Sequence, residues 1–183
     1  MKLVIFAGGC FWGVEHYFQG VKGVISTSVG YTGGGKDNPT YNEVCSDDTG
    51  HAEAVEVVYN PEIISYEELA KLFFEIHDPT QVNRQGHDLG SQYRSEIFYL
   101  NDDQKITSEK LINMLEDKGY KVATKVTKAT TFWKAEEYHQ DYYKKSHLNL
   151  MRKPNMVWIL ICFKFSFFSN PLILFVLIIF YIH

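Results

Sequence analysis

The chain has 183 residues, enough for one domain with a sizeable core and not obviously enough for two. Its formal net charge is −4, from 18 Lys plus Arg against 22 Asp plus Glu, so no basic stripe is available for phosphates and we expect no nucleic-acid partner. The cysteines Cys10, Cys45 and Cys162 show neither a CxxC pair nor a zinc-ligand spacing, which argues against a disulfide-stapled secreted protein and favours a reduced, cytoplasmic one.

The first half of the chain predicts three strands and one helix. Residues 2–7 are rich in Val, Ile and Phe and predict a buried strand, because the run is shorter than the roughly 7–15 apolar residues of a signal peptide. Two glycines then precede a short predicted helix at 11–19. A β-branched strand is expected at 21–31, and a half-buried strand at 51–59, where apolar residues alternate with glutamates. The polar stretch 36–51 predicts a loop.

Helices and strands alternate in the second half. Ser65 and Glu68 form a capping box that opens a helix at 66–77, whose apolar residues repeat at helical spacing. The remaining predicted elements are a polar loop at 79–92, a strand at 94–100, a helix at 102–118, a strand at 121–131 and a helix at 134–146. This order predicts an α+β fold in residues 1–146: a two-layer sandwich of one mixed β-sheet with helices packed on it, and a ferredoxin-like core.

Cys10 lies at the predicted junction between the first strand and the first helix. Gly8 and Gly9 before it let the backbone turn sharply and let a ligand approach closely. At the start of a helix, the dipole and the free N–H groups favour thiolate over thiol, and the thiolate is the attacking species in cysteine redox chemistry. For an isolated cysteine, a small core residue is the commoner interpretation. The glycine pair and the helix-start position favour a reactive thiol here.

The segment Gly9-Cys10-Phe11-Trp12-Gly13 resembles the signature of the A-type peptide methionine sulfoxide reductases. Further segments match that family in order: GYTGG at 30–34, NPTYNEVC at 38–45, TGHAEAV at 49–55, HDPT at 77–80, GSQYRS at 90–95 and YHQ at 138–140. The similarity covers about residues 3–146, and it is specific because several unrelated motifs recur with compatible spacings.

The resemblance implies that Cys10 is the nucleophile and that Phe11 and Trp12 hold the S-methyl group of the substrate. It also implies three residues that bind the sulfoxide oxygen and one that supports the site: Glu53, Tyr41 and Tyr93, with Asp88 in support. The family acts on the S epimer of methionine sulfoxide in oxidised proteins, peptides and the free amino acid. It needs no metal or tightly bound cofactor, and its electrons come from thioredoxin or a comparable thiol.

The residues also account for the chemistry by themselves. A sulfoxide oxygen leaves only when it is protonated or strongly hydrogen-bonded. Glu53 lies on an otherwise apolar strand face, and burial there disfavours the carboxylate, so we expect a neutral acid near pH 7 that donates a proton as the Cys10 thiolate attacks sulfur. Two tyrosine hydroxyls add donors to the oxygen. Methionine then leaves, and Cys10 becomes a sulfenic acid that thiols can reduce.

Each partner of Cys10 also has an ordinary structural interpretation. Taken singly, Glu53 could be a solvent-facing residue of an edge strand and Tyr41 a loop cap. Tyr93 could be an aromatic residue of a strand, and Asp88 a turn residue. The match to the family favours function for all four. His51 and His139 are expected to be structural hydrogen-bonding residues rather than acids or bases.

After residue 146 the composition changes abruptly to a divergent apolar tail at 147–183. One interpretation is a membrane anchor, long enough to span a bilayer but interrupted by Lys164, Ser169, Asn170 and Pro171, with basic residues before it on the cytoplasmic side. The second is a shifted reading frame without selected function. The third, a helix covering the domain, is less favoured because nothing polar alternates near the end. We predict a cytoplasmic monomer, membrane-tethered if the tail is an anchor.

Many relatives carry a glycine-rich C-terminal segment with resolving cysteines, and this chain has no such segment. Cys162 is the candidate beyond the core, but its apolar neighbours raise the pKa of a thiol and slow its attack. Cys45 is the other candidate, and a structural or incidental thiol is the favoured interpretation. We therefore expect an external thiol to reduce the Cys10 sulfenic acid directly.

Two other classes of function compete with the reductase. A redox-sensing binding protein would use Cys10 as an oxidisable switch without turnover, and would not need Glu53 and the tyrosines around one oxygen site. A cysteine hydrolase would use His51 or His139 as base. The hydrolase is weaker, because aromatic residues stand where a base and an oxyanion hole are expected.

Overall fold

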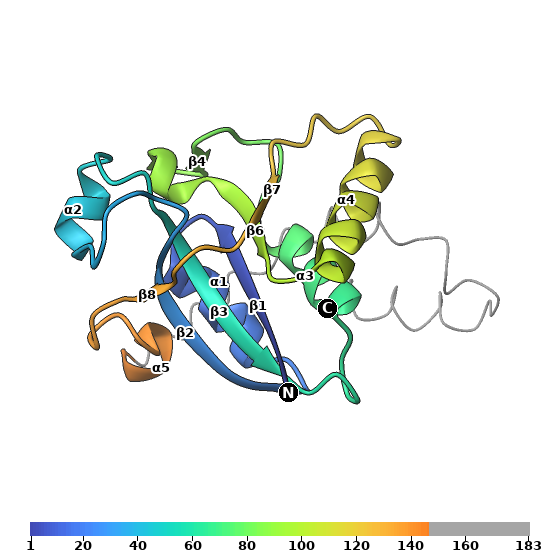
Figure 1. Cartoon of the computed structure of the whole chain (residues 1–183), viewed down its shortest axis with the longest axis horizontal. Coiled ribbons are helices and arrows are strands. Elements are labelled where there is room, and N and C mark those ends of the chain that lie inside the picture. The colour runs from blue at the N-terminus through green and yellow to red at the C-terminus, as the bar shows by residue number, and fades with distance from the viewer. Residues whose placement is uncertain (147–183) are drawn as a thin grey trace, which may run out of the picture.

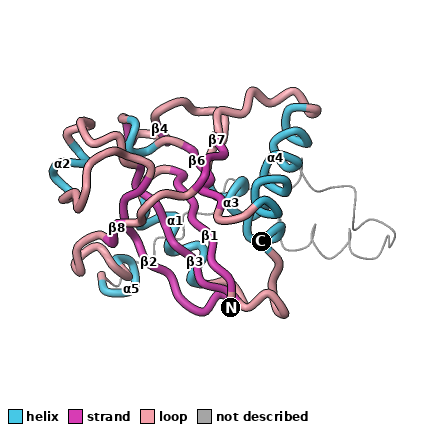
Figure 2. The backbone as a smooth tube through the Cα atoms, viewed as in Figure 1, coloured by secondary structure: helices cyan, strands magenta, loops and turns pink. Residues whose placement is uncertain are grey.

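A six-stranded mixed sheet forms the centre of the protein (Figures 1 and 2), in a computed structural model that describes residues 1–146. The strand order is β7-β6-β1-β3-β2-β8, and every neighbouring pair is antiparallel except β6 and β7. The six strands are β1 (Lys2–Gly8), β2 (Val24–Thr32), β3 (Ala52–Tyr59), β6 (Ser95–Tyr99), β7 (Lys125–Lys128) and β8 (Trp133–Lys134). A separate hairpin joins β4 (Arg84–Gln85) to β5 (Asp88–Leu89).

The longer helices pack against the sheet and each other. In Figure 1, α1 lies behind β1, β2 and β3, and α4 lies at the other end of the molecule beside β6 and β7. The helices are α1 (Phe11–Gln19), α2 (Tyr41–Cys45), α3 (Tyr66–Ile76), α4 (Asp102–Glu116) and α5 (Tyr142–Lys145), with a 3₁₀ turn at Ser91–Tyr93. The predicted capping box is confirmed: Ser65 Oγ accepts from the Glu68 backbone nitrogen, and the Glu68 carboxylate accepts from the Ser65 backbone nitrogen.

The main hydrophobic core lies between the sheet and the helices. Phe6 of β1 is fully buried at its centre and stacks on Phe18 of α1 and Phe73 of α3, with ring centroids 5.3 and 4.8 Å apart. Since side chains alternate along a strand, the opposite face of the sheet carries a second, smaller cluster that includes Ala52 and Phe98. The predicted α+β fold, one mixed sheet with helices packed on it, is therefore confirmed.

Two predicted loops contain short regular elements, and one predicted helix is wrong. The loop at 36–51 holds α2, and the loop at 79–92 holds the β4–β5 hairpin and most of the 3₁₀ turn. The helix expected at 134–146 is reduced to α5, because the Gln140 side chain bonds both the nitrogen and the oxygen of Val29 in β2. Asp141 then takes a left-handed backbone conformation, with φ of 55°, which interrupts any helix. Bonds to a distant strand replace helical bonds here.

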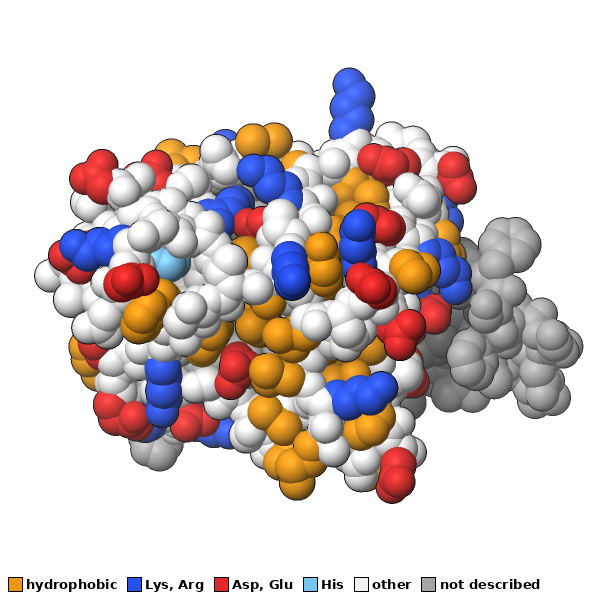
Figure 3. Space-filling model, viewed as in Figure 1, with side chains coloured by type: hydrophobic (Ala, Val, Ile, Leu, Met, Phe, Trp, Pro, Cys, Tyr) orange, Lys and Arg blue, Asp and Glu red, His pale blue; other side chains and the backbone are white. Residues whose placement is uncertain are grey.

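The apolar tail at 147–183, Cys162 included, lies outside the described residues. Within residues 1–146 no helix is long and apolar enough to cross a membrane. Figure 3 shows acidic and basic side chains interspersed on one face of the molecule. That distribution offers no single-signed stripe in this view for a phosphate backbone.

The close approach of β8 to Gly30 of β2 leaves no room for a side chain at Gly30. A Cβ added there would lie 2.4 Å from the Trp133 carbonyl oxygen of β8. We expect Gly30→Ala to lower the free energy of unfolding by about 1–3 kcal/mol, because the β8 edge must move. Gly35→Ala is the control, since its Cβ would meet nothing within 4 Å. Equal denaturant midpoints for the two variants would contradict the close approach of β8.

Candidate active site

Cys10 lies where β1 ends and α1 begins. It precedes the first residue of α1, and its carbonyl oxygen accepts hydrogen bonds from the Gly13 and Val14 backbone nitrogens at 3.1 and 3.4 Å. Gly9 makes the turn with φ of 96°, and a Cβ there would lie 2.7 Å from the side chain of Gln85. Both the backbone angle and this close approach require glycine. The predicted position of Cys10 at the opening turn of the helix is confirmed.

The carboxyl group of Glu53 lies directly beside this turn. Glu53 pairs with Tyr31 across β2 and β3, and its Oε2 accepts a hydrogen bond from the Phe11 backbone nitrogen at 3.0 Å. The residue is only 2% exposed. Burial raises the pKa of Glu53 to about 7; the Phe11 N–H opposes the rise and the charge of Asp88 adds to it. The expectation of a buried acid that binds its proton near neutral pH is confirmed.

The expectation that the helix start lowers the pKa of Cys10 is wrong. Burial is the largest cause and the negative charge of Glu53 the second, and together they raise the pKa of Cys10 to about 12. The backbone N–H groups of Trp12 and Gly13 do lower it, as the helix-start argument requires. Desolvation outweighs them, because the thiol lies in a half-closed apolar site next to a carboxyl group. The resting protein therefore holds Cys10 as a thiol.

Aromatic rings cluster around Phe11 and Trp12, the two residues that follow Cys10. Phe11 is buried, and its ring centroid lies 6.2 Å from that of Trp12. His139 packs against both, at 5.2 and 5.5 Å, and Tyr41 lies 4.5 Å from His139. Tyr142 of α5 stacks on the Trp12 indole at 3.8 Å with an interplanar angle of 7°. We call these five rings the aromatic cage; they present apolar ring surfaces beside Cys10, which packs against the same hydrophobic cluster.

The two candidate tyrosines and Cys10 all lie within reach of the charge of Glu53. Burial raises the pKa of Tyr41, and hydrogen bonding to Cys45 raises it further. Burial also raises the pKa of Tyr93, followed by the negative charge of Glu53, and the charge of Cys10 contributes as well. Both hydroxyls therefore stay protonated at neutral pH and can donate hydrogen bonds to an oxygen in the site.

Asp88 contributes through its charge. It is partly buried on β5, and its charge raises the pKa of Glu53, Cys10 and Tyr93. The hairpin thus brings a second carboxylate to the site, and the structure gathers every residue that the sequence predicted for it. Within residues 1–146, no group of His, Cys, Asp and Glu is arranged to hold a metal ion.

The segment at 136–142 contributes side chains that the sequence did not assign to the site. Glu136 Oε1 accepts from the Tyr41 backbone nitrogen at 3.0 Å, and its Oε2 accepts from the Tyr31 hydroxyl at 2.9 Å. His139 and Tyr142 contact the Trp12 indole. The YHQ match at 138–140 indicated that this segment belongs to the family's pattern. The predicted helix was wrong, however, so the sequence did not predict which side chains of the segment contact the Trp12 indole.

Replacing Glu53 by Gln predicts a pH-dependent gain in stability. The pKa of Glu53 is raised from 4.5 to about 7, so between these values the folded state holds a proton that the unfolded state has lost. Wild-type stability therefore falls as pH rises through this window, by at most about 3 kcal/mol. We expect Glu53→Gln, measured by urea unfolding, to be more stable than wild type at pH 8 and to lose that advantage near pH 4. A pH-independent difference would contradict the buried acid.

Comparison with known proteins agrees with this geometry. A family model described as peptide methionine sulfoxide reductase matches residues 2–156. The chain is 51% identical over 146 residues to the peptide methionine sulfoxide reductase MsrA of Sulfolobus acidocaldarius, covering 79% of this chain and 83% of that protein.

Solved structures agree as well. The reduced form of Mxr1 from Saccharomyces cerevisiae matches with a TM-score of 0.75 and 41% identity, over 80% of this chain and 86% of that one. Mxr1 in complex with Trx2 matches with a TM-score of 0.53 and 30% identity, over 77% of this chain and 84% of that one. The Cys10 turn, the buried Glu53 and these matches over most of the chain lead to one conclusion: the chain belongs to the peptide methionine sulfoxide reductase family.

Proposed function

We propose that this chain reduces methionine-S-sulfoxide, in oxidised proteins and as the free amino acid, to methionine, with Cys10 as the nucleophile. The observation that carries the proposal is the hydrogen bond from the Phe11 backbone nitrogen to Glu53 Oε2. It fixes a proton donor with a pKa of about 7 beside the residue that carries the reactive sulfur. Sulfoxide reduction needs this combination of a nucleophilic sulfur and an acid for the departing oxygen.

The proposal assigns one group of the site to each small group of the substrate. The S-methyl group enters the cage of Phe11 and Trp12, where its burial is favourable by about 1 kcal/mol. The sulfoxide oxygen is directed to Glu53 and to the Tyr41 and Tyr93 hydroxyls. Asp88 supports the site through its charge. These donors are held in place before the reaction, so they stabilise the developing charge on oxygen without reorganising.

The pKa values of Glu53 and Cys10 determine where the proton lies before the reaction. Between about pH 7 and about pH 12 the pair of Glu53 and Cys10 holds one proton, and Cys10 carries it. Attack needs the thiolate with the proton on Glu53. We infer that the proton passes from the thiol to the sulfoxide oxygen by way of Glu53. The thiolate electron pair forms a bond from the Cys10 sulfur to the substrate sulfur, and the protonated oxygen leaves as the S–O bond breaks. That hydroxyl oxygen then bonds to the Cys10 sulfur, and the S–S bond breaks with its electron pair returning to the substrate sulfur, which gives methionine and a Cys10 sulfenic acid.

Two thiols complete the cycle. One condenses with the sulfenic acid to give a mixed disulfide and water, and the second releases Cys10, so one methionine sulfoxide consumes two thiols and yields one disulfide. Thioredoxin or a comparable thiol is the reductant, which the solved complex of the relative Mxr1 with Trx2 supports. We propose direct reduction, since partial desolvation of its sulfur raises the pKa of Cys45, which slows attack by this thiol on the sulfenic acid.

We further propose that residues 1–146 form the catalytic domain and act as a monomer in the reducing cytoplasm. The described elements from β1 to α5 include every residue assigned above. Residues 147–183 are then dispensable for the chemistry and serve, if at all, as a membrane tether.

The two alternative functions lose support. A redox sensor needs only an oxidisable Cys10, whereas this site also brings the buried acid Glu53 and the Tyr93 hydroxyl within electrostatic reach of the sulfur. A hydrolase needs a base at the thiol. His51 is committed to the Gly34 backbone nitrogen and the Lys36 carbonyl oxygen, and His139 to the Trp12 indole.

A stereospecific assay tests the proposed function. We expect the full chain and the chain ending at Ser146 to reduce the S epimer of methionine sulfoxide over many turnovers with thioredoxin. Cys10→Ser removes the nucleophile, so its rate falls to the uncatalysed background. Glu53→Gln removes the acid, which predicts a loss of about 10²–10⁴-fold. Cys45→Ser is the matched control for loss of a thiol and should keep multiple turnover. A single turnover in Cys45→Ser would show that Cys45 resolves the intermediate.

The pH dependence of the first turnover tests the proton count. Below about pH 7 both Glu53 and Cys10 are protonated, so the pair holds two protons. Above about pH 7 the pair holds one proton, which is the number in the reacting state of thiolate and protonated carboxyl group. We expect the second-order rate constant for sulfenic acid formation to rise through about pH 7 and then stay level. Glu53→Gln should lack this rise. A rate that falls through pH 7 would contradict the proposed transfer from thiol to carboxyl.

A further inference from the structure

The indole of Trp12 donates a hydrogen bond to a specific atom of His139. Trp12 Nε1 lies 3.2 Å from His139 Nδ1. An indole N–H can only donate, so Nδ1 is the acceptor and the neutral ring carries its proton on Nε2. Burial lowers the pKa of His139, which keeps the imidazole in this neutral, accepting form.

The other nitrogen of His139 makes no compensating bond among the described residues. His139 is 1% exposed, and its Nε2 has no hydrogen-bond partner there; the Glu136 Oε2 oxygen lies 4.0 Å away. A buried donor without an acceptor costs about 1–3 kcal/mol. The stabilising polar contact of this ring is therefore the one that it makes with Trp12.

The Trp12 indole is held at its face as well as its edge. Tyr142 stacks on it at 3.8 Å and 7° while His139 bonds the pyrrole nitrogen. An indole restrained from both directions keeps one orientation. On the other side, Trp12 neighbours Phe11 in the cage assigned to the substrate methyl group.

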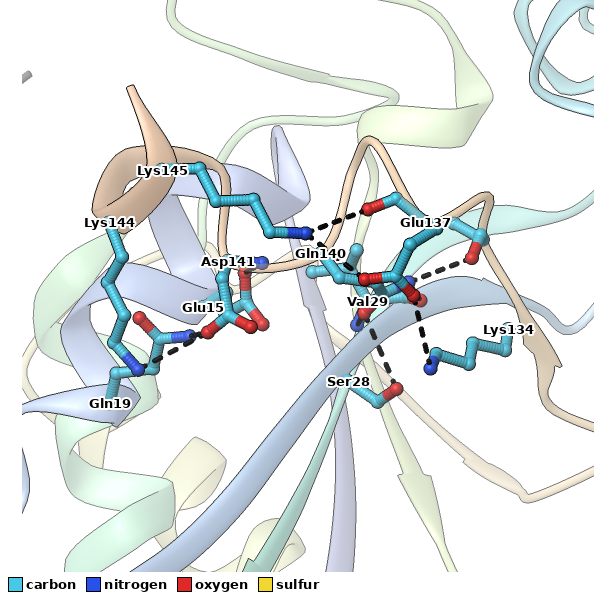
Figure 4. A network of polar contacts seen from close by, with 11 residues as sticks. Glu15, Gln19, Ser28, Val29, Lys134, Glu137, Gln140, Asp141, Lys144 and Lys145 are labelled. Atoms are coloured by element: carbon cyan, nitrogen blue, oxygen red, sulfur yellow. Dashed lines mark hydrogen bonds and ion pairs between the residues drawn. The ribbon is translucent and has the colours of Figure 1, made fainter. Parts of the chain in front are cut away.

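The segment that carries both restraints is anchored to the body of the fold (Figure 4). Gln140 bonds Val29 of β2 through both backbone atoms, each at 2.9 Å. The Asp141 backbone nitrogen donates to Glu15 Oε2 at 3.0 Å, and Gln19 Nε2 donates to Asp141 Oδ1 at 2.8 Å. These bonds tie the two residues between His139 and Tyr142 to β2 and α1. The position of the imidazole is therefore set by the fold and not by the indole.

We propose that His139 is a positioning residue which, by fixing the Trp12 indole, sets the width of the alkyl cage and so selects methyl over larger sulfoxide substituents. The inference rests on the proposed function for the identity of the substrate. An apolar pocket distinguishes one methylene by about 10–200-fold only when its walls cannot yield. A free indole would rotate and admit an ethyl group, whereas an indole held by His139 cannot.

The test compares His139→Asn with His139→Gln, two uncharged variants of similar polarity. The Asn side-chain oxygen reaches the position of Nδ1 and can accept from Trp12, whereas the Gln amide extends toward the position of Nε2. We measure kcat and KM for the S epimers of methionine sulfoxide and ethionine sulfoxide in the full chain. We expect His139→Gln to lose about tenfold of the methyl preference, mainly through KM, and His139→Asn to keep it within about threefold. In a Trp12→Phe background the two variants should not differ. Equal loss or equal retention in both variants overturns the proposal.

A second readout does not depend on catalysis. The Trp12 indole ¹H–¹⁵N resonance, identified by its disappearance in Trp12→Phe, should shift upfield in His139→Gln and stay near its wild-type position in His139→Asn. An unchanged resonance in His139→Gln overturns the positioning role whatever the kinetics show. If wild type reduces no sulfoxide while the indole resonance responds as expected, the proposed function fails and the hydrogen bond stands.

Discussion

The hydrogen bond between the Phe11 backbone nitrogen and Glu53 Oε2 is the constraint on which the active site depends. It joins the first turn of α1 to the centre of the sheet, because β3 is flanked by both β1 and β2. The same bond satisfies one of the free N–H groups at the helix start and one oxygen of a buried carboxyl group. Cys10, next to Phe11, is thereby kept within reach of the charge of this acid.

In this arrangement, two electrostatic effects on the pKa of Cys10 oppose each other. The N–H groups of Trp12 and Gly13 favour the thiolate, and burial together with the charge of Glu53 favours the thiol. The net result keeps Cys10 protonated near neutral pH, and the proposed mechanism has this proton pass to the sulfoxide oxygen. The cost is a carboxyl group buried at 2% exposure, so the site is built at some expense of stability above neutral pH.

The cage around the sulfur is assembled from distant parts of the chain. Phe11 and Trp12 come from α1, Tyr41 from α2, and His139 and Tyr142 from the end of the described chain. Glu136 links two of these parts, because it bonds the Tyr41 backbone nitrogen and the Tyr31 hydroxyl. The segment around Gln140 therefore forms one side of the site. Hydrogen bonds to β2 and α1 hold it in place, rather than helical bonds of its own.

The sequence by itself determined the order of the main strands and helices, the capping box at Ser65, and the place of Cys10 at a glycine turn, because these follow from periodicity and backbone preference over a few residues. It also indicated the burial of Glu53 from the apolar strand around it. Only the tertiary structure decided the direction of the Cys10 pKa and the loss of the helix predicted at 134–146. The physical reason is that desolvation and side-chain bonds act between residues far apart in sequence: 42 positions separate Phe11 from Glu53, and 127 separate Trp12 from His139.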